Sequence, residues 1–206
     1  MPKGKEPILI VGGGPVGLTT ALRLSQFGVR SIVLEKNKTV QNELRASTFH
    51  PPTIEMLDEI GVATELISIG LKTKCWQFRV HETGEKAVFD LGHIAQDTKY
   101  AYRLQVEQKE LCRLATNKAE ADENIELRMG HKFEGLRQKE GFVEIKARNK
   151  NHKKYKIETP ILIAADGSSS EIRKTMDLEF PGLTYPETTI LVATQFPFHE
   201  HINGLS

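Results

Sequence analysis

The sequence has 206 residues, of which 39% are hydrophobic and 27% charged, as is typical of a folded globular protein. Its net charge is only +1, from 28 basic and 27 acidic side chains, and this balance argues against a nucleic-acid partner, which selects basic surfaces. It lacks the run of about 18 apolar residues that spans a membrane, and its two distant cysteines, Cys75 and Cys112, favour a reducing cytoplasm over a secreted disulfide framework.

The first predicted element is a buried parallel strand, because Ile8 to Val11 are four apolar residues in a row. It is followed by Gly12, Gly14 and Gly17 in the G-x-G-x-x-G spacing of dinucleotide-binding proteins. In that motif the first glycine permits a tight turn, the second lets a pyrophosphate approach the backbone, and the third lets the helix lie close to the strand. The lysines before the strand do not make it a signal peptide, because glycines and a proline interrupt the apolar run.

A helix is predicted from Pro15 to Phe27, with proline at its start and Gly28 as its stop. Its first residues, Pro15 and Val16, would face the phosphates, whose negative charge a helix N-terminus favours.

A second apolar strand, Ser31 to Leu34, leads to Glu35 and Lys36. A carboxylate at the tip of the second strand binds ribose hydroxyls and repels a 2′-phosphate, which favours FAD or NAD over NADP. The alternative is a βαβ unit whose glutamate is an ordinary exposed residue.

Arg45 lies in the loop that follows, near the expected phosphate edge of the sheet. A guanidinium there could clamp a diphosphate, and the alternative is a solvated surface arginine. A short helix opened by prolines and closed by Gly61 comes next. Its residues Ile54, Leu57 and Ile60 recur on one face and are predicted to be core.

Alternation over Trp76–Val80 and Ala87–Leu91 predicts a β-hairpin with one buried face, which we interpret as a piece of a second, β-rich domain. A helix from Val106 to about Ala119 and a strand over Ile125–Met129, the third of the nucleotide-binding sheet, are predicted to follow.

Two alternating strands, Phe142–Ala147 and Tyr155–Glu158, flank a basic run that is typical of a solvated hairpin tip. Near the end of the chain, Thr189–Phe196 is one more strand candidate. His199 and His201 lack a third ligand nearby and are expected to be surface residues.

A buried strand before Asp166 and Gly167 would end at the carboxyl edge of the sheet, where open α/β sheets bind ligands. Ser168 and Glu171 have the spacing of a capping box at the start of a helix. Asp166 is therefore either a cofactor contact or a turn residue before that helix.

Taken together, these motifs resemble the FAD-dependent aromatic hydroxylases, the flavoprotein monooxygenases of the p-hydroxybenzoate and phenol hydroxylase type, over residues 7 to about 185. The resemblance implies that Glu35 binds the adenosine ribose, and that Arg45 and Gln105 line the FAD along its diphosphate and ribityl chain, with Arg103 a weaker candidate. It also implies a role for Asp166-Gly167 in handling both FAD and NAD(P)H. The matching segments are Gly12–Leu18, Glu35-Lys36, Arg45-Ala46 with Thr53–Leu57, Arg103–Gln105, and Asp166-Gly167 with Ser170 and Arg173.

The resemblance implies an α/β fold: a Rossmann-like FAD-binding domain of the GR2 type over 1–75 and 104–180, with part of a β-rich substrate domain over 76–103 and 181–206. It implies hydroxylation of a small aromatic substrate by O2, with NADH or NADPH as transient reductant and no catalytic side chain or metal. Ala164, Gln108 and Lys109 depart from the family pattern, and no Gly-Asp dipeptide is present. We therefore expect the N-terminal portion of such an enzyme, which does not hydroxylate by itself.

Two other interpretations remain, and a third is discounted. A non-catalytic FAD- or nucleotide-binding fragment could be completed by a partner chain or a homo-oligomer. A flavin halogenase would need a W-x-W-x-I-P box, and Trp76 is the chain's one tryptophan. An NAD dehydrogenase would leave Arg45-Ala46 and the Asp166-Gly167 helix start unexplained.

Overall fold

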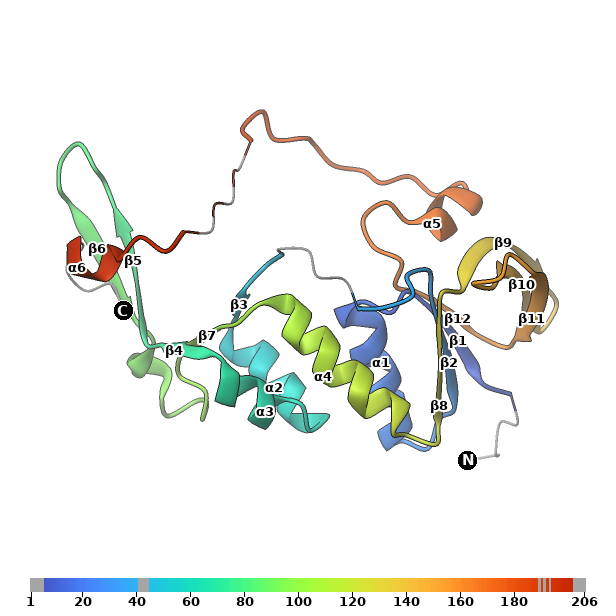
Figure 1. Ribbon diagram of the computed structural model, residues 1–206. Coiled ribbons are helices and arrows are strands. Elements are labelled where there is room, and N and C mark those ends of the chain that lie inside the picture. The colour runs from blue at the N-terminus through green and yellow to red at the C-terminus, as the bar shows by residue number, and fades with distance from the viewer. Residues whose placement is uncertain (1–5, 41–44, 189, 191, 193, 202–206) are drawn as a thin grey trace.

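The computed structural model of the chain describes residues 6–40, 45–188, 190, 192 and 194–201. Its centre is a four-stranded, all-parallel sheet in the order β12-β1-β2-β8 (Figure 1). The strands are β1 (Ile8–Val11), β2 (Ser31–Glu35), β8 (Ile125–Met129) and β12 (Leu162–Ala164). The expected α/β class is confirmed, and β1 and β2 lie where the two apolar runs predict them.

Both faces of this sheet are covered, which explains the continuous apolar runs Ile8–Val11 in β1 and Ile32–Leu34 in β2. On one face, Ile10 and Val33 pack with α1 (Pro15–Gln26) and α4 (Gln108–Glu120). On the other face, Leu9, Val11, Ile32 and Leu34 pack against side chains of a second sheet. Successive residues of a strand thus enter different cores, as the two-residue repeat requires.

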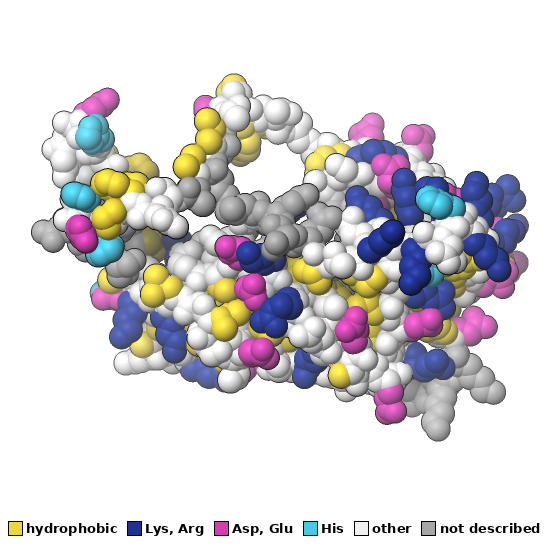
Figure 2. Space-filling view, viewed as in Figure 1, with side chains coloured by type: hydrophobic (Ala, Val, Ile, Leu, Met, Phe, Trp, Pro, Cys, Tyr) yellow, Lys and Arg dark blue, Asp and Glu magenta, His cyan; other side chains and the backbone are white. Residues whose placement is uncertain are grey.

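The second sheet is antiparallel, in the order β11-β10-β9, and lies across the parallel sheet from α1 and α4 (Figure 1). Its strands are β9 (Lys132–Lys139), β10 (Phe142–Arg148) and β11 (Lys154–Thr159). The last two are the predicted hairpin, whereas β9 was not predicted. Figure 2 shows that basic side chains gather on the surface of this sheet.

A third, small sheet has the strand order β3-β7-β4. It lies at the end of the helical layer that is farther from the parallel sheet (Figure 1). The predicted short helix is present as α2, and its expected core residues Ile54, Leu57 and Ile60 are buried. The elements of this region are β3 (Thr48–Phe49), α2 (Pro51–Glu59), α3 (Ala63–Ile69), β4 (Leu71–Thr73) and β7 (Arg103–Gln105).

The hairpin of β5 (Cys75–Arg79) and β6 (Lys86–Asp90) projects from this end of the molecule, followed by a short 3-10 helix (Leu91–Ile94) (Figure 1). The strands and their pairing are as predicted, but the expectation of a buried face is wrong. The apolar side chains Phe78 and Phe89 remain 63% and 45% exposed. A two-stranded ribbon cannot bury its own face, and no layer of the described residues covers it.

The last described elements are α5 (Glu171–Thr175) and α6 (Phe198–His201). The predicted capping box is wrong, because the N-cap of α5 is Ser170, whose Oγ accepts from the backbone N–H of Arg173 at 3.0 Å. Gly167, with φ +86°, continues the turn after β12, so the helix begins two residues later than predicted.

The predicted strand over 189–196 lies partly outside the described residues, and its described positions 190, 192 and 194–196 are not in a strand. His199 and His201 are exposed in α6, in agreement with the sequence prediction. Among the described helices, none combines the length and apolar character that a membrane crossing needs.

Candidate functional site

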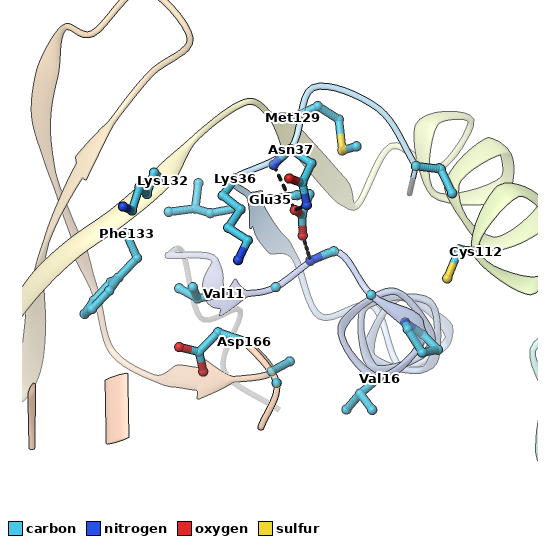
Figure 3. A pocket seen from close by; sticks show the side chains of 18 of the residues that line it. Val11, Val16, Glu35, Lys36, Asn37, Cys112, Met129, Lys132, Phe133 and Asp166 are labelled. Atoms are coloured by element: carbon cyan, nitrogen blue, oxygen red, sulfur yellow. Dashed lines mark hydrogen bonds between the residues drawn. The ribbon is translucent and has the colours of Figure 1, made fainter. Parts of the chain in front are cut away.

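A cavity of about 510 Å³ opens at the carboxyl ends of the parallel strands. This is the edge at which open α/β sheets bind ligands, and the volume lies in the range of small-molecule sites. Residues from β1, α1, β2 and its following loop, α4, the β8–β9 segment and the segment after β12 meet there, and Figure 3 shows labelled side chains from these regions. Nine of the predicted site residues line it: Gly12, Gly14, Pro15, Val16, Glu35, Lys36, Arg45, Asp166 and Gly167.

The three glycines of the motif have different physical reasons to be glycine. A Cβ at Gly12, where φ is +113°, would lie 2.1 Å from the carbonyl oxygen of Ala165, and a Cβ at Gly17 would lie 1.8 Å from the carbonyl oxygen of Gly12. Apart from its chain neighbours, a Cβ at Gly14 would meet no atom of the described residues within 4 Å. Gly12 and Gly17 are therefore required by packing, whereas Gly14 lies at the cavity wall and faces open space.

Glu35 connects the tip of β2 to the glycine turn. Its Oε2 accepts from the backbone N–H of Gly13 at 2.7 Å, and its Oε1 accepts from the backbone N–H and side-chain amide of Asn37 at 2.8 and 2.5 Å (Figure 3). These amides fix the carboxylate in place at the cavity wall. A carboxylate has about four acceptor positions, so capacity remains for ligand hydroxyls.

Arg45 and Asp166 line the same cavity although 121 residues separate them (166 − 45). Their convergence follows from the parallel topology, which brings the loops after different strands to one edge.

Asp166 has a structural role that is visible without any ligand. Its Oδ1 accepts from Ser170 Oγ at 2.6 Å, and its Oδ2 accepts from the backbone N–H groups of Glu171 and Ile172 at 2.8 and 3.2 Å. These groups belong to the start of α5, whose first N–H groups have no partner within the helix. Of the two interpretations of Asp166, the turn residue before a helix is thus observed, and the cofactor contact remains a prediction.

Three predicted site residues do not line this cavity. Gly17 is buried beneath the turn, as its packing role requires. Gln105 accepts from Thr48 Oγ1 at 2.9 Å, within the small third sheet. The guanidinium of Arg103 lies over the ring of Trp76, 4.7 Å from its centroid. Flavin contacts from Arg103 and Gln105 remain predictions.

The sequence prediction missed the residues that β8, its turn and α4 contribute. The available signal was the prediction of β8 as the third strand of the nucleotide-binding sheet, whose carboxyl end belongs at the ligand edge. Its pairing with β2, which brings Met129 next to Glu35, was not predicted. The pKa of His131 in this turn is lowered by burial and then by the positive charges of Arg128 and Lys150. The missed lining residues are Gln108, Lys109 and Cys112 of α4, and Met129, His131, Lys132 and Phe133 of the β8–β9 segment. The loop after β2 adds Asn37, Thr39 and Val40, and Val11, Gly13, Leu34, Ala165, Ser169 and Glu171 also line the cavity without having been predicted.

Cys112 offers a chemical measure of access to the cavity. Burial, and secondarily the negative charge of Glu35, raises the pKa of its thiol. A raised pKa leaves less thiolate at neutral pH, so we expect iodoacetamide to alkylate Cys112 at least about tenfold more slowly than the exposed Cys75. Mass spectrometry of the Cys75→Ser and Cys112→Ser variants separates the two rates. Equal rates would contradict the buried position, and a cavity ligand should slow Cys112 alone.

The cavity fits a flavin dinucleotide on two structural grounds. The open position at Gly14 lies at the N-terminus of α1, a site that suits a diphosphate. The fixed carboxylate of Glu35 lies on the adjacent strand, where a ribose is bound in dinucleotide-binding folds.

Comparison with known proteins gives the same result. The family described as FAD binding domain matches residues 5–203. Para-nitrophenol 4-monooxygenase of Pseudomonas sp. strain WBC-3 is 32% identical over 98% of this chain and 49% of its own length. Pentachlorophenol 4-monooxygenase of Sphingobium chlorophenolicum is 27% identical over 89% of this chain and 34% of its own length.

Solved structures agree in fold. The crystal structure of p-nitrophenol 4-monooxygenase from Pseudomonas putida superposes with a TM-score of 0.82 at 33% identity, over 87% of this chain and 45% of that one. The chain thus spans about half the length, or less, of the relatives that it matches. With its glycine turn, its fixed Glu35 and a match over nearly its whole length, the chain belongs to the FAD binding domain family, and its relatives are FAD-dependent aromatic monooxygenases.

Proposed function

We propose that the cavity holds FAD and that the chain is the FAD-binding part of an NADH- or NADPH-dependent monooxygenase that hydroxylates a small aromatic or phenolic substrate. The observation that carries the proposal is the open position at Gly14 beside the fixed carboxylate of Glu35. The names of the relatives support the reaction class.

Each part of the site then has a role in binding. The backbone around Gly12, Gly14 and the start of α1 at Pro15 and Val16 would receive the diphosphate, and Glu35 would accept from the adenosine ribose. The positive charges of Lys36 and Arg45 would balance the phosphates, with Arg103 and Gln105 farther along the cofactor. Asp166 and Gly167, which follow β12, would form another part of the wall of the FAD cavity.

A bound flavin would supply the redox chemistry, accepting hydride from NAD(P)H and activating O2. The side chains of this chain position the cofactor, and the proposal requires no acid, base or metal from them. Within the described residues, no group of three or more His, Cys, Asp or Glu side chains could hold a metal ion.

We further propose that residues 1–75 and 104–180 form the FAD-binding domain, and that 76–103 and 181–206 belong to the substrate domain. The support is the projecting β5–β6 hairpin, whose apolar side chains lack a covering layer within the described residues. A cytoplasmic location is proposed from the two free cysteines.

The exposed hairpin face also supports the second candidate, an FAD-binding fragment completed by a partner chain or a further copy. Product analysis of the chain alone tests whether it needs completion, which both candidates require. We expect the 206-residue chain, supplied with FAD, NAD(P)H and a panel of phenols, to give no hydroxylated product and at most slow peroxide release, because hydroxylation requires a site that excludes water. Stoichiometric hydroxylation by the chain alone would show that it needs no partner chain and no further protein segment for activity.

Cofactor identity is tested by titrating the ligand-free chain with FAD and with NAD, followed by fluorescence. Tighter binding of NAD would overturn the assignment. In the same assay, Glu35→Ala should weaken FAD binding by about 1–3 kcal/mol, the scale of hydrogen bonds to a charged group. The matched control is Glu85→Ala in the exposed hairpin loop, which should leave FAD affinity unchanged.

A further inference from the structure

Four exposed lysines surround the turn between β8 and β9, beside the cavity; we call Lys36, Lys38, Lys132 and Lys150 the lysine collar. Lys36 and Lys132 line the cavity itself. Lys38 and Lys150 pack on Gly130 in the turn, where an added Cβ would lie 3.5 Å from Lys38 Cγ and 3.1 Å from Lys150 Cβ. The four residues come from the loop after β2, the start of β9 and the β10–β11 loop, so the fold gathers them.

The charge of the lysine collar is only partly offset by neighbouring acids: Glu171 is electrostatically close to Lys132, and Glu35 and Asp166 contribute two carboxylates to the cavity wall. Within the described part of the chain, none of the four lysines forms an ion pair, whereas the acids on the surrounding elements are already paired. Glu126 binds Arg128 at 2.8 Å, Glu134 binds Arg148 at 2.8 Å, and Glu171 binds Lys174 at 2.9 Å. Glu35 accepts from backbone amides instead. A net positive field therefore remains at this side of the cavity.

The field is local to this end of the molecule. The whole chain carries a net charge of only +1, yet Figure 2 shows Lys and Arg side chains concentrated over the β9–β11 sheet. His131 lies in the same turn, and its pKa is lowered first by burial and then by the positive charges of Arg128 and Lys150.

We propose that the lysine collar is an electrostatic capture surface that speeds the arrival of the anionic FAD diphosphate at the cavity. This inference rests on the proposed function. Clustered charge of one sign beside a cleft raises the association rate of an oppositely charged ligand, and salt suppresses the effect. Lys38 and Lys150 do not line the cavity, so they act on the approach of the ligand rather than on the bound state.

The test is stopped-flow measurement of FAD association and dissociation over a series of NaCl concentrations. The variant is Lys38→Glu with Lys150→Glu. The control is Lys74→Glu with Lys86→Glu, exposed residues at the β5–β6 hairpin, which Figure 1 places at the opposite end of the molecule. Both double variants change the net charge by the same amount. Far-UV circular dichroism and melting curves establish that both are folded.

We expect the Lys38/Lys150 variant to associate on the order of tenfold more slowly at low salt, with the difference vanishing at high salt. The dissociation rate should stay within about twofold, because rim charges act mainly on association. The charge-neutral pair Lys38→Gln and Lys150→Gln should fall between this variant and the wild type.

Three results would overturn the proposal: an unchanged association rate, an equal slowing in the hairpin control, or an effect confined to the dissociation rate. Failure of the wild-type chain to bind FAD at any salt concentration would instead reject the proposed function, and the two failures are distinguishable.

Discussion

Replacing Gly17 with alanine should destabilise the fold by about 4 kcal/mol or more, the range reached by severe steric conflict in a core. The added Cβ would lie 1.8 Å from the carbonyl oxygen of Gly12 and 3.4 Å from a methyl group of Ile10. Because the first contact is with backbone, no side-chain rotation relieves it, and α1 must move away from β1. Urea denaturation followed by circular dichroism measures the loss.

Gly14→Ala is the matched control for this experiment, since it makes the same chemical change three residues earlier in an open position. A Gly17→Ala protein with nearly wild-type stability would contradict the close contact between the helix and the glycine turn.

The second large effect is expected on FAD binding, from the same Gly14→Ala substitution. The methyl group would enter the space that we assign to the diphosphate, so FAD affinity should fall at least tenfold, or about 1.4 kcal/mol. Stability without ligand should change by about 1 kcal/mol or less, because Gly14 is an N-cap with an extended conformation that alanine adopts. Fluorescence titration and denaturation of one preparation give both numbers.

Gly182→Ala provides the control for binding, because an added Cβ there also meets nothing within 4 Å, and Gly182 is outside the cavity. Retained FAD affinity in Gly14→Ala would remove the main structural support for the diphosphate position. The two glycine variants thus separate the part of the motif that builds the fold from the part that receives the ligand.

The elements of the parallel sheet could be predicted because their physical signals are local. β1 is an uninterrupted apolar run that ends at a glycine, and α1 begins with a proline and ends before Gly28. The pairing of β1 with β12 was not predicted, because it joins two segments far apart in the sequence and has no local signal.

The missed elements lack such signals. β9 reads Lys-Phe-Glu-Gly-Leu-Arg-Gln-Lys, in which only Phe133 is fully buried, and a glycine interrupts the alternation. β3, β4 and β7 have only two or three residues each, too few for any period to show. They exist because of pairing between distant segments, such as Thr48 with Gln105.

The candidate site divides in the same way. Residues inside a motif, such as Gly14 and Glu35, could be named from the sequence because their spacing carries the information. Cys112 and His131 reach the cavity only because α4 and the turn after β8 pack against it. Neither residue belongs to a sequence motif whose spacing would identify it as part of a site. The contact of Arg103 in β7 with Trp76 in β5, away from the cavity, could not be predicted either, because it depends on where the β5–β6 hairpin lies in the fold.

The position of β12 at the edge of the parallel sheet has a consequence for how the chain reaches its native state. Leu9 of β1 pairs with Leu162 of β12, which is 153 residues later (162 − 9). Gly12 packs against the carbonyl of Ala165, directly after β12. On the ribosome, the glycine turn therefore leaves the exit tunnel long before the strand that supports it. Pairing across such a separation is slow, so the glycine turn reaches its native packing only after nearly the whole described chain has been synthesised.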